Sequence, residues 1–142
     1  MFGNIGHGYS AQWIDAVLGD FDAQDAGWAW WQWRENQYWG IVGANGQIVN
    51  LAALRHLARP YVVAAPAGVH AGRGDGVTGR LILKVTASHA DQPVEIGWSA
   101  LTLSSPIAKG TCLNTSAWDA ASARLTLGLD SGAGCQITIS VS

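Results

Sequence analysis

Five of the chain's eight tryptophans lie between Gly27 and Gly40, in the stretch GWAWWQWRENQYWG. The run at residues 27–33 is short, aromatic and bounded by glycine, which favours a β-strand. A polar segment at residues 34–37 follows it directly. Aromatic ring faces can stack on sugar rings, and polar side chains can bind hydroxyl groups. The combination is therefore typical of a carbohydrate-binding site.

The tryptophans have a second interpretation, because indole rings also fill protein cores well. Alternation along a strand would place Trp31 and Trp33 on one side and Trp28 and Trp30 on the other. Trp31 and Trp33 lie nearest the polar segment, which favours sugar binding for these two. For Trp28 and Trp30, core packing and binding remain equally open.

Other chemistry is poorly represented in the sequence. Three aspartates between Gly19 and Ala26 are interpreted as solvated loop charges rather than as an acid–base pair. No Cys or His spacing resembles a zinc site. There is no Ser-His-Asp arrangement, phosphate-binding loop or dinucleotide fingerprint. We therefore expect neither a metal nor a cofactor.

The composition is that of a globular chain, with 142 residues, 49% hydrophobic and 13% charged. The net charge of −2 gives no reason to expect nucleic acid as a partner. No apolar run is long enough to span a bilayer. The first ten residues have neither the basic nor the apolar region of a secretory signal.

Cys112 and Cys135 are the only cysteines, and both lie in the last third of the chain. A disulfide between them would suggest an exported protein. Two buried thiols are the equally open alternative.

The first 59 residues combine helical and strand patterns. A helix is expected from Ala11, capped by Ser10 and ended by Gly19. The aromatic strand follows, then a turn at residues 44–46, then a short helix that Asn50 caps. A lone strand has no sheet partner. This pattern therefore predicts the end of a larger α/β domain.

Beyond residue 60 the apolar residues alternate with polar ones at a period of two. Short runs of this kind occur at residues 81–86, 94–96, 101–103, 125–129 and 135–141, separated by turn-forming residues. They predict an antiparallel β-sandwich. The change of period places a domain boundary near residue 60, with domains at 1–59 and 60–142.

These features together resemble the C-terminal end of a family five glycoside hydrolase of the endoglycoceramidase and glycosylceramidase-like group. The residues that carry the resemblance are Phe2-Gly3, the run GWAWWQW at 27–33, Trp39-Gly40 and Arg59-Pro60-Tyr61. The resemblance implies that residues 1–59 are the last strand and helices of a TIM barrel. It implies that residues 60–142 are the β-sandwich that follows such a barrel.

The resemblance also implies roles for individual residues. Trp31 would form the floor of the sugar subsite, and Glu35 and Asn36 would contact hydroxyl groups. Trp33 joins this substrate-binding set because it lies beside the polar segment. In the parent enzyme the substrate would be a carbohydrate or glycolipid.

No catalytic residue is expected in this chain. Retaining glycosidases need two carboxyl groups about 5 Å apart. In the family the nucleophilic glutamate falls where this chain has Met1, and the acid/base lies further upstream. Glu35 and Glu95 belong to different predicted domains, so we do not interpret them as the pair. The chain is expected to be a fragment that is inactive alone. The alternative is a non-catalytic β-sandwich that binds carbohydrate or is purely structural.

Overall fold

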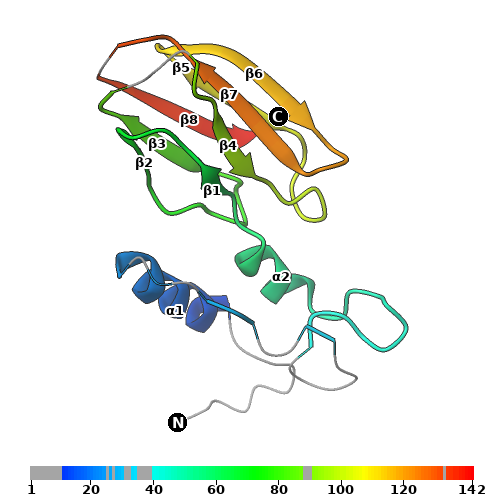
Figure 1. Ribbon diagram of the computed structural model, residues 1–142. Helices are drawn as coiled ribbons and strands as arrows, with labels where there is room; N and C mark the ends of the chain where they lie inside the picture. Colours follow the sequence, from blue (N-terminus) through cyan, green and yellow to red (C-terminus); the bar gives the residue numbers. More distant parts are fainter. Residues whose placement is uncertain are drawn as a thin grey trace. The chain divides into compact units, whose positions relative to one another are not determined.

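The computed structural model describes residues 11–24, 26, 28–30, 33–34, 40–87, 91–132 and 134–142. The chain divides into two units, Met1–Leu57 and Ala58–Ser142, and Figure 1 shows the elements of each. The first unit ends at Leu57, two residues before the predicted domain end at residue 59.

The first unit contains helices α1 (Ala11–Ala23) and α2 (Leu51–Leu57), which pack against each other. On α1 the buried residues are Ile14 and Leu18, four positions apart and therefore on one face. On α2 they are Ala53, Leu54 and Leu57. The small core of this unit therefore includes one apolar stripe from each helix.

Helix α1 is longer than the sequence predicted. It runs through Gly19, the expected stop, to Ala23, so the expected loop at 19–26 is wrong over its first half. A helix-interior glycine costs only about 1 kcal/mol relative to alanine. Phe21 continues the apolar stripe one turn further. The helix ends where the amide of Ala26 donates to the carbonyl of Phe21 at 2.9 Å.

The predicted start of α2 and the turn before it are confirmed. The Asn50 Oδ1 atom accepts a hydrogen bond from the Ala53 amide at 3.0 Å, which is an N-cap. In the turn, Gly46 has a φ of 79° and its amide donates to the Gly43 carbonyl at 2.9 Å. A positive φ of this size favours glycine.

The described part of the aromatic run is not a strand. Residues 28–30 and Trp33 lie outside every strand. Only single bridges form here, a parallel one between Arg34 and Val42 and an antiparallel one between Val42 and Ile48. A strand needs a hydrogen-bonded neighbour along its length. Among the described residues of this unit, no strand offers one.

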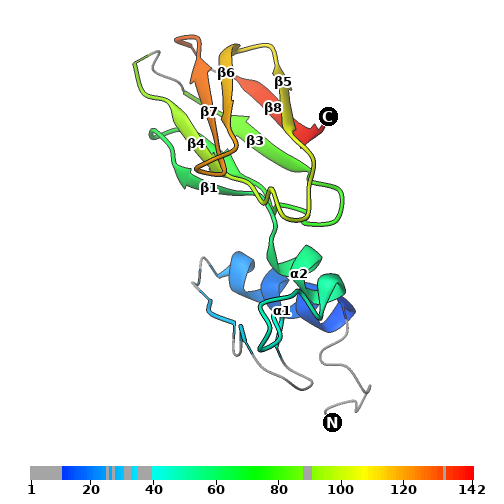
Figure 2. The same cartoon turned by 90° about the vertical axis from the view of Figure 1, so that its right-hand side faces the viewer.

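The second unit is a β-sandwich, as predicted. One sheet has the strand order β1-β4-β7-β6 and the other β2-β3-β8-β5, and all pairs are antiparallel. Figure 2 shows the two sheets as two layers. The strands are β1 (Tyr61–Ala64), β2 (Val69–Ala71), β3 (Leu81–Val85), β4 (Val94–Gly97), β5 (Pro106–Gly110), β6 (Leu113–Asp119), β7 (Arg124–Leu129) and β8 (Cys135–Val141).

The sandwich core lies between these layers and follows the period of two. Alternate residues of the central strands point inward, and on β7 this places Leu125, Leu127 and Leu129 in the core at 0–1% exposure. The other members of the core are Leu81, Leu83, Val85, Val94, Ile96, Trp98, Leu103, Ile137 and Ile139. Burying each such side chain contributes about 1.5–3 kcal/mol before entropy is counted.

One predicted strand is wrong. Residues 101–103 form a turn, in which the Leu103 amide donates to the Ser99 carbonyl at 3.0 Å. Leu101 is exposed while Leu103 enters the core. Two alternating leucines fit this turn as well as a strand. The next strand instead begins at Pro106, at the edge of its sheet, where the missing amide donor is tolerated.

A disulfide joins Cys112 to Cys135, with a Cα–Cα distance of 6.1 Å. It ties the connection between β5 and β6 to the first residue of β8. The bridge spans 23 residues of sequence. Closing a loop of this size stabilises the fold by about 3 kcal/mol in the chain-entropy description.

Candidate carbohydrate site and apolar pocket

Of the four predicted substrate-binding residues, the structure describes only Trp33. Trp31, Glu35 and Asn36 lie outside the described residues. The carbonyl of Trp33 accepts hydrogen bonds from the amides of Ile41 and Val42, at 3.0 and 2.9 Å. Its side chain is 51% exposed. The backbone is thus anchored while much of the indole is open to a ligand.

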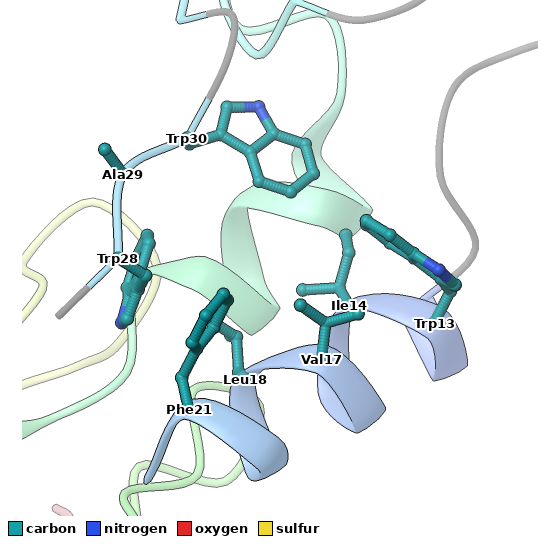
Figure 3. A pocket seen from close by; sticks show the side chains of 8 residues that line it. All are labelled: Trp13, Ile14, Val17, Leu18, Phe21, Trp28, Ala29 and Trp30. Carbon is teal, nitrogen blue, oxygen red and sulfur yellow. The ribbon is translucent and has the colours of Figure 1, made fainter. Parts of the chain in front are cut away.

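Next to this position in the sequence, residues 28–30 and helix α1 enclose a pocket of about 270 Å³ (Figure 3). Every described residue that lines it is apolar or aromatic. The lining residues are Trp13, Ile14, Val17, Leu18, Phe21, Trp28, Ala29 and Trp30. A pocket with this lining can hold flat rings or aliphatic groups by dispersion and apolar burial.

The base and the rim of the pocket differ in burial. Ile14 and Leu18 are 1% and 3% exposed and belong to the core. Trp13, Phe21 and Trp28 are 36–41% exposed. The aromatic rim is therefore accessible to a ligand or to another polypeptide.

None of the described side chains that line the pocket titrates. An ionic contact in this unit joins His56 Nδ1 to Asp15 Oδ2 at 2.9 Å. Within the described ranges, no group of three or more His, Cys, Asp or Glu could hold a metal ion. The described side chains of the pocket therefore offer an apolar binding surface.

Sequence reasoning assigned Trp13 and Val17 to a helix but did not predict this pocket. The signal was present in the spacing of Trp13, Val17 and Phe21, which repeat every four residues along one helical face. The expected helix end at Gly19 removed Phe21 from that face. The expected helix end therefore hid the continuous apolar stripe.

No helix in the described part of the chain is long and apolar enough to cross a membrane.

Comparison with known proteins gives a fold likeness. No protein-family model matches the sequence, and no curated protein matches it. Solved structures of endo-glycoceramidase II from Rhodococcus sp. do match. Its complex with a five-membered iminocyclitol aligns with a TM-score of 0.66 and 20% identity, over 93% of this chain and 30% of that one.

Two further structures of the same enzyme agree. Its lactosyl-enzyme intermediate and its ganglioside GM3 complex both align with a TM-score of 0.63 and 20% identity, over 93% of this chain. The alignments cover 30% of the chain in the lactosyl-enzyme structure and 28% of the chain in the GM3 complex. This chain therefore spans less than a third of the solved chains that it matches.

The alignment must include most of both units, since it leaves out only 7% of the chain and the first unit alone is 57 of 142 residues. Across both units, this chain shares the fold of part of endo-glycoceramidase II from Rhodococcus sp..

Proposed function

We propose that this chain is the C-terminal part of a retaining family five glycoside hydrolase. Residues 1–59 would be the end of its barrel, and residues 60–142 would be its β-sandwich. The observation that carries the proposal is the fold likeness, which extends over 93% of this chain and 30% of a glycosidase chain. The motifs around the tryptophan run, described from the sequence, support the same assignment independently of the fold.

The first unit gives this proposal physical support. Its described residues contain isolated bridges but no strand pair, and its pocket has an exposed aromatic rim. Both features suit a segment whose neighbours are further strands and helices of a barrel. In such barrels the active site is built from the loops at the C-terminal ends of the strands.

In the assembled enzyme, Trp31 and Trp33 would stack on the apolar faces of sugar rings, and Glu35 and Asn36 would bind hydroxyl groups. The exposed indole of Trp33 suits this role. One matched structure holds ganglioside GM3 and another a lactosyl group. We propose the same substrate class, an oligosaccharide or a glycolipid, for the parent of this chain.

The chain by itself is proposed to be inactive. Retention requires a nucleophile and an acid/base about 5–5.5 Å apart. The only glutamates are Glu35 and Glu95, and they fall in different units. Asp15 on helix α1 forms an ion pair with His56 on helix α2.

The test compares the chain alone with a polypeptide extended by the reading frame upstream of Met1. We expect the extension to encode an α/β domain that supplies the two catalytic carboxylates absent from this chain. Hydrolysis of an aryl β-lactoside and of GM3 should appear only in the extended protein. Replacing Trp31 with alanine there should lower kcat/KM by about tenfold, because ring stacking contributes about 0.5–1.5 kcal/mol beyond the apolar area that it buries. Hydrolysis by the chain alone, or an in-frame stop codon just upstream, would refute the proposal.

A non-catalytic sandwich is the second candidate. The observation that favours it is the second unit itself, which has its own core of twelve buried residues and its own disulfide. Such a unit can serve as a binding module or as a structural support.

A further inference from the structure

The outer face of the sheet β1-β4-β7-β6 carries an open tyrosine ring. Tyr61 on β1 lies opposite Gly97 on β4. A Cβ atom added to Gly97 would be 2.5 Å from both the Cε1 and the Cζ atom of Tyr61. The ring therefore lies over the glycine, where a larger residue would displace it. The side chain is nevertheless 56% exposed, so much of the ring faces solvent.

Polar side chains lie on the same face, within one or two strands of the ring. Gly97 is opposite Arg124 on β7, and Glu95 is opposite Thr126. All of these point outward, because the intervening Ile96 and Leu125 are in the core. The ring covers Gly97, and Arg124 lies on the next strand, about 4.8 Å further across the sheet. Glu95 lies two residues before that glycine, on the same strand.

Neither charge has a partner within the described residues. The side chains of Glu95 and Arg124 make no hydrogen bond or ion pair there, with each other or with another group. Both residues are partly buried. The neighbouring carboxylate, Asp119 opposite Arg124, is instead engaged by the Ala121 amide and the Ser122 hydroxyl. An acceptor and a donor are thus available beside the ring.

This set of groups matches the surface of a neutral pyranose. The C–H face of a sugar stacks on an aromatic ring, and its hydroxyls both donate and accept hydrogen bonds. The guanidinium of Arg124 can donate hydrogen bonds to these hydroxyls, and the carboxylate of Glu95 can accept hydrogen bonds from them. The two opposite charges nearly cancel, which disfavours an anionic ligand. We propose that Tyr61, Glu95 and Arg124 form a shallow binding site for a neutral pyranoside. This site lies in the second unit and does not depend on the proposed barrel.

A purely structural role for the ring makes a different prediction. Aromatic side chains that cover glycines stabilise sheets without binding anything. In that case every substitution of Tyr61 would change stability only, and no sugar would bind this face. The experiment must therefore measure binding and stability separately.

The test is a titration of the full chain with lactose and with cellobiose, followed by backbone amide NMR shifts. We expect saturable shifts centred on Gly97, Arg124 and Thr126. Sorbitol, which has hydroxyls but no ring, should produce none. Tyr61→Phe should keep the affinity within about threefold, and Tyr61→Leu should weaken it by about tenfold or more. Arg124→Gln should weaken it by about threefold or more. Lys109→Gln, on the other sheet, should leave it unchanged.

Two results would overturn the site. One is the absence of saturable shifts on this face with either sugar. The other is an affinity that neither Tyr61→Leu nor Arg124→Gln changes. If Tyr61→Leu does not fold, the double variant Glu95→Gln with Arg124→Gln replaces it, since this variant leaves the ring over Gly97 in place. An unchanged sugar affinity in the double variant would then overturn the site. Shifts confined to Trp33 would also count against this site, although they would support the sugar subsite proposed for the first unit.

Discussion

His56 on α2 and Asp15 on α1 approach to 2.9 Å between Nδ1 and Oδ2, and they join the two helices of the first unit. The histidine is 19% exposed and the aspartate 45%. Partly solvated pairs of this kind contribute little, about 0.2–1 kcal/mol. We expect a double-mutant cycle with Asp15→Asn and His56→Gln to give a coupling energy within that range at pH 6. Chemical denaturation of the four proteins measures it, and a coupling above about 2 kcal/mol would contradict this description.

Gly74 is a position where the backbone itself leaves no room for a side chain. A Cβ atom there would overlap the carbonyl group of Pro60, which cannot move like the end of a flexible side chain. We expect Gly74→Ala to lower the free energy of unfolding by about 1–3 kcal/mol. Gly72→Ala is the matched control, because its Cβ would meet only the Ile82 carbonyl, at an ordinary 3.5 Å. Equal thermal stability of the two variants would be the contrary outcome.

The disulfide between Cys112 and Cys135 should be a major source of stability for the sandwich. The double variant Cys112→Ser, Cys135→Ser should lose about 3 kcal/mol in unfolding free energy, because its unfolded chain is no longer constrained. Urea denaturation with and without a reductant measures this loss. The reductant should destabilise the parent chain and leave the double variant unchanged. Free thiols in the purified parent, detected by alkylation and mass spectrometry, would argue against the bridge.

Strong alternation made the central strands predictable, as in Leu125, Leu127 and Leu129, where every second residue is both apolar and buried. The edge strand β6 escaped prediction because Asn114, Thr115, Ser116 and Ala117 are all exposed, so no apolar alternation marks them. Its position is set by pairing with β7. A pattern that records burial cannot detect a strand that is held mainly by backbone hydrogen bonds.

The candidate sites were predictable only in part. Trp33 could be selected because an aromatic run meets a polar segment, and its exposure is compatible with binding. The Tyr61 site could not be predicted from the sequence. The sequence does not show that Gly97 lies beneath the ring or that Arg124 is the next residue across the sheet. Those relations are properties of strand register, which only the folded chain determines.

The exposed aromatic rim of the first unit should promote self-association of the chain. Trp13 and Phe21 are 41% and 36% exposed on the same face of α1, whereas Ile14 beside them is 1% exposed. The variant Trp13→Gln, Phe21→Gln should reduce association at high concentration by removing apolar surface, and should change stability little. Ile14→Ala is the contrasting variant and should cost about 2–4 kcal/mol. Light scattering and denaturation together separate these effects, and unchanged association in the double glutamine variant would show that another surface is responsible.

The pKa of the Asp119 carboxylate should lie below its ordinary value. A hydrogen bond from the Ser122 hydroxyl, at 2.6 Å, and one from the Ala121 amide, at 2.9 Å, hold its pKa below the ordinary value of 3.8. Because the folded pKa is lowered, the stabilisation is present above the unfolded pKa and is lost as pH falls through the folded pKa. Ser122→Ala removes the larger cause, so the pKa of Asp119 should return toward 3.8. A carboxyl-detected NMR titration measures the pKa of Asp119 in both proteins. If Ser122→Ala leaves the midpoint of Asp119 unchanged, this hydroxyl is not what stabilises the charge.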